Sequence, residues 1–315
     1  MKIYNTVYSN ICRGMANYVK ENNLSCMILG ISGGLDSTIS AMICKEVSKE
    51  TGVKLIGVSM MCDTNKDDEI SIADRVGSLF CDEYYHVNLQ QIYESISNFL
   101  YITKAVGNNK TKIAEGNIKA RLRMMYLWHL GGLKNGVVID TDNLTEHYLG
   151  FWTLMGDSNY ITPIGNLWKS EVYDLVKFKI NEYKNILKID EDMFNYNINI
   201  CYEYKTLTSS EKEHYESIIK VLEDVINIIP TDGNGVSSSD LEQIGGKSYK
   251  EVDDILKTVV MNSFNTNEYI RLVKQYGSET VEKVITRYKN SEFKRKHLPL
   301  SIDYNTGQVV EKRIV

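Results

Sequence analysis

The sequence lacks several features that would place it in a specialised class. Its 315 residues include six cysteines but no CxxC pair, and Cys81 with His86 supplies too few ligands for a zinc site. The N-terminal residues contain no apolar signal core, and no apolar run approaches the roughly 18 residues that span a bilayer. We therefore expect free thiols, a cytoplasmic location and no membrane association.

The chain also lacks an excess of basic residues. Its formal net charge is −5, whereas a protein that binds a nucleic-acid backbone normally carries a basic face. A local basic cluster at 294–296 lies near the C-terminus, where such clusters are usually solvated. The composition, 43% hydrophobic and 24% charged, is ordinary for a globular protein of one large or two modest domains, and we expect no nucleic-acid partner.

Strand and helix patterns alternate along the first half of the chain. Residues 1–24 have apolar side chains four apart, which predicts an amphipathic helix. We expect strands at 26–31, 54–60, 83–89 and 136–141, and helices at 37–49, 67–80, 92–101 and 114–130, the last closed by Gly131–Gly132. This alternation predicts an α/β fold, a doubly wound parallel sheet flanked by helices.

The composition changes between residues 181 and 224. This stretch is rich in Asn, Tyr, Lys and Glu and has neither Gly nor Pro. We interpret it as a helical insertion or lid within a single domain of residues 1–315. Helical patterns resume over residues 249–289.

The first predicted strand runs into the turn LGISGGLDST, Leu29–Thr38. The turn is not a GxxxxGK[ST] loop, since no lysine follows the glycines, and Ser32 and Leu35 rule out GxGxxG. Glycine backbone N–H groups, two serine hydroxyls and the start of a helix suit a phosphate ligand. Asp36 would repel a bare pyrophosphate, so its presence indicates a bridging Mg²⁺. A turn simply capped by Asp36 is the competing interpretation.

The segment SGGLDS resembles the pyrophosphate (PP) loop of ATP pyrophosphatases, which cleave ATP between its α and β phosphates. Six further segments, in order, resemble ammonia-dependent NAD synthetases: GNIKARLRM (Gly116–Met124), DTDNLTEHYLGFWTLMGD (Asp140–Asp157), PIGNLWKSEVYDL (Pro163–Leu175), PTD (Pro230–Asp232), GKSYKEVDDIL (Gly246–Leu256) and SEFKRKHLP (Ser291–Pro299). The resemblance spans nearly the whole chain apart from 181–224. It implies an adenine nucleotide α-hydrolase-like fold and a C–N ligase that uses ATP to adenylate deamido-NAD. Ammonia then replaces AMP, with pyrophosphate already released.

The resemblance also implies a role for each matching residue. Asp36 and Glu146 would hold Mg²⁺, and Lys169 would act with Asp36 in catalysis by offsetting phosphate charge. Arg121 would grip the dinucleotide, joined by the tail residue Lys294. The ATP site as a whole would comprise Gly30, Ser32, Gly33, Gly34, Leu35, Asp36, Ser37, Thr141, Lys169 and Thr231.

The family forms homodimers with sites near the interface, so Lys294 would reach a site of the second subunit. Ordinary alternatives stay open, because Arg121 could be a surface charge and Glu146 a helix-capping residue. The segment before the PP loop is too short for a glutaminase domain. We therefore expect the nitrogen to arrive as free ammonia or from a partner.

Three positions on the substrate side depart from the family pattern. Leu154 replaces the usual lysine, and Phe293, which we place at the substrate site beside Lys294, replaces the usual histidine. The segment between Asp157 and Pro163 is shorter than usual and lacks the expected aspartate. The favoured hypothesis is a divergent NAD synthetase, and the alternative is a paralogue that amidates a different carboxylate.

Two other classes fit the sequence less well. A tRNA-modifying or sulfur-inserting ATP pyrophosphatase would usually bring paired cysteines or a basic surface, and neither is visible in the sequence. A non-catalytic nucleotide-binding protein would have no need for Asp36, Glu146 and Lys169 together.

Overall fold

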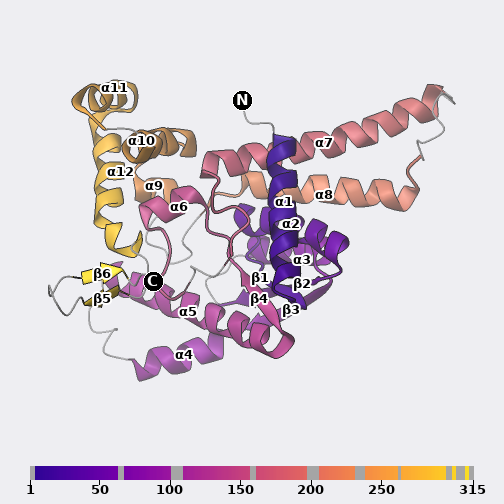
Figure 1. The fold of residues 1–315 in the computed structure, drawn as a ribbon, viewed down its shortest axis with the longest axis horizontal. Helices are drawn as coiled ribbons and strands as arrows, with labels where there is room; N and C mark the ends of the chain where they lie inside the picture. The colour runs from indigo at the N-terminus through magenta and orange to yellow at the C-terminus, as the bar shows by residue number, and fades with distance from the viewer. Residues whose placement is uncertain are drawn as a thin grey trace.

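A parallel sheet lies at the centre of the computed structural model, which describes residues 4–62, 67–100, 109–156, 161–196, 206–230, 238–261, 264–295, 300–302 and 309–311 (Figure 1). Its strands are β1 (Cys26–Gly30), β2 (Lys54–Met61), β3 (Glu83–Asn88) and β4 (Gly136–Ile139). They form one four-stranded sheet in the order β3-β2-β1-β4, and every pairing is parallel. The four predicted strands are confirmed, although the last ends at Ile139 rather than at residue 141.

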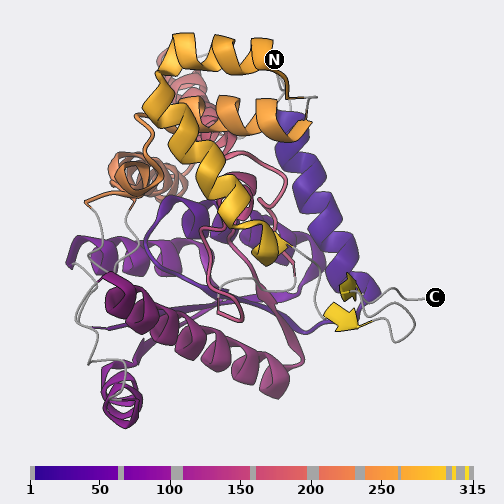
Figure 2. The same cartoon turned by 90° about the vertical axis from the view of Figure 1, so that its left-hand side faces the viewer.

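Both faces of this sheet are covered because its strands are apolar on both sides. In β1, Met27 and Leu29 belong to one hydrophobic cluster and Ile28 to another. The first cluster includes α1 (Tyr4–Glu21), α2 (Leu35–Thr51) and α3 (Asp67–Phe80), and the second includes α4 (Gln90–Phe99) and α5 (Asn109–Lys134). Figure 2 shows α4 and α5 on one side of the sheet. The predicted α/β class with a parallel sheet flanked by helices is confirmed.

The predicted end of α5 is wrong. The helix continues through Gly131 and Gly132 to Lys134, and Asn135 ends it in the left-handed region with φ 51°. A Cβ atom on Gly131 would lie 3.2 Å from the carbonyl oxygen of Gly136, at the start of β4. Gly131 therefore allows a close approach of helix to strand rather than capping the helix.

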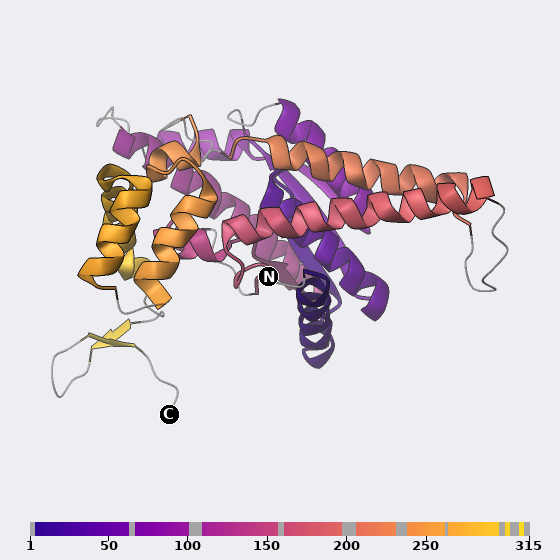
Figure 3. The same ribbon diagram turned by 90° about the horizontal axis from the view of Figure 1, so that it is seen from above.

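Two long helices run side by side away from the sheet (Figures 1 and 3). They are α7 (Lys169–Tyr196) and α8 (Ser209–Asn227), which pack against each other. Near the sheet both helices enter the first hydrophobic cluster, for example through Leu175 and Leu222, each fully buried. Apart from residues 206–208, the described part of the 181–224 stretch is thus helical. Its role as an insertion or lid stays a prediction.

The remaining helices form a separate cluster beside the carboxyl ends of the strands (Figure 2). They are α6 (Leu144–Leu149), α9 (Asp240–Ile244), α10 (Tyr249–Met261), α11 (Thr266–Tyr276) and α12 (Ser278–Asn290), followed by a 3-10 turn (Glu292–Arg295) and a hairpin of β5 (Leu300–Ile302) and β6 (Val309–Glu311). Buried Leu149, Trp168 and Val252 share one core, which ties α6 and α10 to the residue before α7. Among the described helices, none combines the length and apolar character needed to cross a bilayer.

Candidate active site

The PP loop joins β1 to α2 and is shaped by two glycines with different tasks. Gly33 has φ +80°, and a Cβ atom there would lie 2.2 Å from the backbone oxygen of Glu69, so only glycine fits. Gly34 is the N-cap of α2 in extended conformation, without a side-chain cap. The helix therefore starts at Leu35, slightly before the predicted Ser37, with the amide groups of its first turn free of a side-chain cap.

The two serines of the loop hold it in shape. The hydroxyl oxygens of Ser32 and Ser37 lie 2.9 Å apart, and the Ser32 hydroxyl accepts a hydrogen bond of 3.2 Å from the Gly34 N–H. Ser37 donates to the Gly34 carbonyl at 3.1 Å. Hydroxyl groups and the N-terminus of a 17-residue helix thus meet at one point, the arrangement that suits a phosphate group.

Asp36 is not the N-cap of α2, because Gly34 takes that position. Its carboxylate instead pairs with the ammonium group of Lys169 and accepts a hydrogen bond of 3.3 Å from the side-chain amide of Asn143. The same ammonium donates to Glu146 at 3.0 Å. Side chains from α2, α6 and α7 therefore meet as one cluster, Asp36–Glu146–Lys169, which we call the charge cluster.

Glu146 caps α6 and pairs with Lys169, while its role as a Mg²⁺ ligand stays a prediction. One carboxylate oxygen accepts from the Asn143 N–H at 3.2 Å and completes a capping box at the start of α6, while the other faces Lys169. Helix capping thus orients the carboxylate toward the ammonium group.

The charge cluster is buried enough to perturb its members. Lys169 is 2% exposed, yet the neighbouring Asp36 and Glu146 outweigh the cost of burial and raise its pKa well above the ordinary value. Burial, together with the charge of Asp36, raises the pKa of Glu146 to about 7, although Lys169 opposes the shift. Two carboxylates and one ammonium group leave a net negative charge whenever Glu146 is ionised.

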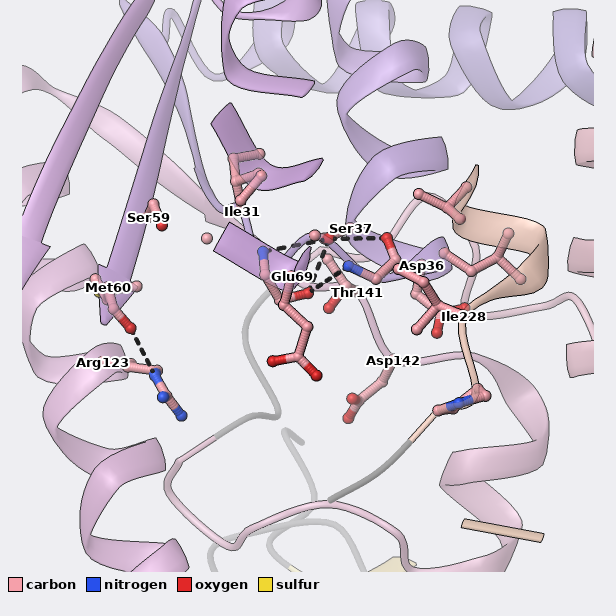
Figure 4. Close-up of a pocket in the computed structure, with 18 of the residues that line it drawn as sticks. Ile31, Asp36, Ser37, Ser59, Met60, Glu69, Arg123, Thr141, Asp142 and Ile228 are labelled. Carbon is pink, nitrogen blue, oxygen red and sulfur yellow. Dashed lines mark hydrogen bonds between the residues drawn. The ribbon is translucent and has the colours of Figure 1, made fainter. Parts of the chain in front are cut away.

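The charge cluster opens into a cavity of about 420 Å³ at the carboxyl ends of the strands. Gly30, Ser32, Gly33, Gly34, Leu35, Asp36, Ser37, Thr141, Glu146 and Lys169 all line it, as the sequence analysis required of the ATP and metal sites. Thr231, the remaining predicted ATP residue, lies outside the described residues. Figure 4 shows Asp36 and Thr141 on one side of the cavity, with Arg123 and Met60 on the other.

The predicted substrate residues lie elsewhere. Arg121 is exposed and donates to the Leu154 carbonyl at 3.3 Å. Lys294 donates to the carbonyl of Gly150 at 2.7 Å and to that of Trp152, and Phe293 is 59% exposed. None of the three is among the cavity-lining residues of the described chain. Their role in substrate binding stays a prediction.

Two basic residues that sequence reasoning missed do line the cavity. Arg123 donates from Nε to the Met60 carbonyl at 3.3 Å, and Lys119 is buried with its ammonium group 4.6 Å from the ring centre of Tyr93. With Leu127 they follow a spacing of four along α5, which places them on one helical face. This spacing of four is the sequence signal that could have identified Lys119 and Arg123. Arg121 falls on the opposite, exposed face of α5.

The fold and this site define a class: an α/β protein with a parallel sheet, a PP loop at the carboxyl end of β1 and a charge cluster beside it. The sequence profile described as NAD synthase matches residues 7–189 and 204–298. The chain belongs to the NAD synthase family, whose members are amide-forming ligases, and the family resemblance drawn from the sequence is confirmed.

Individual relatives agree with this assignment. The chain is 32% identical over 184 residues to an NH(3)-dependent NAD(+) synthetase of Campylobacter jejuni, which covers 58% of this chain and 70% of that protein. It is 32% identical over 178 residues to the protein of the same name from Methanocaldococcus jannaschii, which covers 55% and 65%.

Solved structures share the fold. NMN synthetase from Francisella tularensis superposes with a TM-score of 0.68 at 22% identity, over 95% of this chain and 98% of that chain. The NH3-dependent NAD synthetase of Campylobacter jejuni, solved with nitrate, gives a TM-score of 0.50 at 26% identity, over 73% and 99%. At 22% identity the first likeness establishes the fold alone.

Proposed function

We propose that this chain catalyses the ATP-dependent amidation of deamido-NAD to NAD, with ammonia as the nitrogen donor. The observation that carries the proposal is the charge cluster beside the PP loop in a member of the NAD synthase family. The nicotinate carboxylate attacks the α-phosphorus of ATP, and pyrophosphate leaves. Ammonia then attacks the acyl carbon of the adenylate, loses a proton and displaces AMP.

The chain's own residues contribute position and charge rather than acid–base chemistry. The first turn of α2, together with Ser32 and Ser37, would bind the phosphate groups that become pyrophosphate. Lys169 would neutralise charge on the leaving group, because its raised pKa keeps it protonated. Thr141 lines the same cavity at the end of β4 and would hydrogen-bond the nucleotide.

We also propose that Asp36 and Glu146 hold Mg²⁺ when the nucleotide is bound. Their carboxylates face one ammonium group, so the position between them already suits a cation. Among the described residues, no group of three or more His, Cys, Asp or Glu side chains could hold a metal ion alone. This fits Mg²⁺, which commonly binds through one or two carboxylates plus substrate phosphates. When bound, the ion would supply charge neutralisation of the phosphates.

The direct test is to incubate the purified chain with ATP, Mg²⁺, ammonium chloride and deamido-NAD. We expect NAD, AMP and pyrophosphate in equal amounts, no products without Mg²⁺, and much slower formation of all three with Asp36→Asn. Formation of ADP and phosphate, or ATP turnover without any amide, would contradict the proposal.

The altered residues Leu154 and Phe293 favour a specific second candidate, a paralogue that amidates another carboxylate. The Francisella protein is named for NMN, whose parent acid is nicotinate mononucleotide, so this acid belongs in the same assay. If nicotinate mononucleotide is amidated while saturating deamido-NAD yields no NAD, the paralogue hypothesis replaces the proposal that deamido-NAD is the substrate.

We further propose that the chain forms a homodimer through the outer face of α5. Met125 is 57% exposed, Trp128 37% and Leu133 69%, and they lie along one side of the helix. An interface that completes a site should be large and apolar at its centre. Sedimentation should give a dimer that Leu133→Glu converts to monomer, while Ile270→Glu, at an exposed position of α11, leaves it intact. A wild-type monomer with full activity would contradict this.

The thiols are consistent with a cytoplasmic location, which we also propose. Within the described residues, Cys12, Cys26, Cys44, Cys62 and Cys81 form no disulfide bond. A reducing compartment keeps cysteines in this state. Cell fractionation should recover the protein with cytoplasmic markers, and recovery with secreted protein would contradict this.

A further inference from the structure

One buried carboxylate outside the cavity connects two parts of the charge cluster. Asp253 lies on α10 and is 1% exposed. One of its oxygens accepts a hydrogen bond of 2.5 Å from the hydroxyl of Thr145, in the first turn of α6. The other accepts from the backbone N–H of Ser170, in the first turn of α7, at 2.9 Å.

The Thr145 hydroxyl extends this connection. It also accepts a hydrogen bond of 2.8 Å from the backbone N–H of Lys169. The first two N–H groups of the 28-residue helix α7 are therefore satisfied by side chains of α6 and α10 rather than by a local cap residue. The negative charge of a carboxylate at this position also interacts favourably with the positive, N-terminal end of the helix dipole.

Both residues that Asp253 contacts are next in sequence to members of the charge cluster. Thr145 precedes Glu146, and Ser170 follows Lys169. Because one rigid carboxylate holds both first turns, the separation of α6 from α7 is fixed at the point where Glu146 and Lys169 meet at 3.0 Å. Burial raises the pKa of Asp253, and its hydrogen bonds to Ser170 and Thr145 oppose that shift.

We propose that Asp253 is a positioning residue of the active site: by joining the first turns of α6 and α7, it sets the placement of Glu146 and Lys169 for adenylation. The catalytic part of this inference rests on the proposed function. Asp253 itself touches no substrate, so its effect should appear in the rate of the bound complex rather than in substrate affinity.

The kinetic test compares Asp253→Asn with Asp254→Asn. Asparagine keeps the shape but cannot accept from both Thr145 and Ser170. We expect kcat to fall at least about tenfold with KM values nearly unchanged. Asp254 is the neighbouring acid on α10, is partly exposed, and pairs with Arg271 at 3.2 Å, so its variant should keep the wild-type kcat. Wild-type kcat in folded Asp253→Asn would overturn the proposal.

A second pair of variants covers the case in which Asp253→Asn does not fold. Thr145→Val removes the hydroxyl that links Asp253 to Lys169, and Thr145→Ser restores it. We expect Thr145→Val to lower kcat and Thr145→Ser to recover most of it. Equal loss in both, or loss in neither, would overturn the proposal.

A labelling test is independent of the reaction. Lys169 is 2% exposed and should react slowly with an acetylating reagent in the wild type, as followed by peptide mass spectrometry. We expect labelling at least about tenfold faster in Asp253→Asn or Thr145→Val, because loosening the helix start raises the open population. Unchanged labelling overturns the positioning role. Faster labelling in a chain that forms no amide would retain it and refute only the proposed function.

Discussion

The part of the site proposed to bind phosphate (the phosphate half) and the part predicted to bind the substrate (the substrate half) are built in different ways. In the phosphate half, side chains bind side chains: Lys169 bridges Asp36 and Glu146, and all three are largely enclosed. In the substrate half, Arg121 and Lys294 bind backbone carbonyls of residues 150–154, near the surface.

This difference has consequences for what each half tolerates. A buried side-chain cluster depends on each member, since loss of the Lys169 charge leaves two carboxylates without a counter-charge and loss of a carboxylate leaves Lys169 with one partner fewer. A backbone carbonyl is supplied by any residue, so Leu154 can replace lysine without loss of its contact to Arg121. The structure thus allows the substrate half to diverge while the phosphate half keeps its residues.

The largest expected effect is in the phosphate half. Asp36→Asn keeps the size of the side chain but removes its charge, and we expect kcat to fall at least about 100-fold. Arg121→Gln, in the substrate half, should mainly raise the KM for the dinucleotide by about tenfold. Steady-state kinetics on both variants, with thermal melting as the folding control, measures the contrast. Equal loss of kcat in the two variants would remove the distinction between the halves.

The backbone of the PP loop should show the next largest effect. Gly33→Ala places a methyl group against the Glu69 carbonyl at positive φ, and we expect a loss of at least about 2 kcal/mol in unfolding free energy. Gly34→Ala is the matched control, because φ there is −84° and the nearest atom, the Ser32 hydroxyl oxygen, is 3.3 Å away. Urea titration compares them. A Gly33→Ala protein as stable as Gly34→Ala would mean that the loop adapts easily.

Much of the phosphate half could be predicted because its signals are local in the sequence. The PP loop follows directly from strand, turn and helix within Leu29–Thr38. Glu146 and Lys169 are predicted from short motifs of the family resemblance, and they lie in the first turns of α6 and α7. Whether α2, α6 and α7 meet depends on the order of the strands in the sheet. The alternation of strands and helices along the sequence restricts that order but does not determine it. The bond from Asp253 to Ser170 spans 83 residues and has no local signal.

Other features could not be read locally, for identifiable reasons. A glycine at position 131 is typical of a helix end, but here glycine is needed because α5 packs closely against the start of β4. Arg121 and Arg123 are two residues apart on α5, so they point to different sides, and the facing side depends on which face covers the sheet. The motif resemblance selected Arg121, whereas Arg123 lines the cavity.

A smaller effect should sharpen the comparison within the substrate half. Leu154→Lys restores a charged donor beside the site, and we expect the KM for deamido-NAD to fall about tenfold while the KM for ATP changes little. Met155→Lys is the control, because Met155 is adjacent but 62% exposed. Initial-rate kinetics over both substrates decides. A KM for deamido-NAD that stays unchanged or rises in Leu154→Lys would show that this position does not read the dinucleotide.

The smallest expected effect is that of a substitution at the opposite end of the sheet. It gives a reference value for charged residues that lie outside both halves of the site. Glu83, at the start of β3, accepts from Lys54 and Lys134, each at 2.9 Å, and these bonds lower its pKa from 4.5 to about 2. A carboxylate whose pKa is lowered by folding stabilises the fold above its unfolded pKa. That contribution is lost as the pH falls from 4.5 toward 2.

Glu83→Gln should therefore lower Tm at pH 7 by no more than about 2 °C, because these partly exposed ion pairs are screened by solvent. The difference from wild type should shrink as the pH is lowered below 4.5, where the wild-type carboxylate begins to lose its charge. Thermal melts at several pH values measure this, and amide synthesis at pH 7 should be unchanged. A loss of stability in Glu83→Gln as large as that in Gly33→Ala would contradict this. It would show that burial does not separate the substitutions with strong effects from those with weak effects.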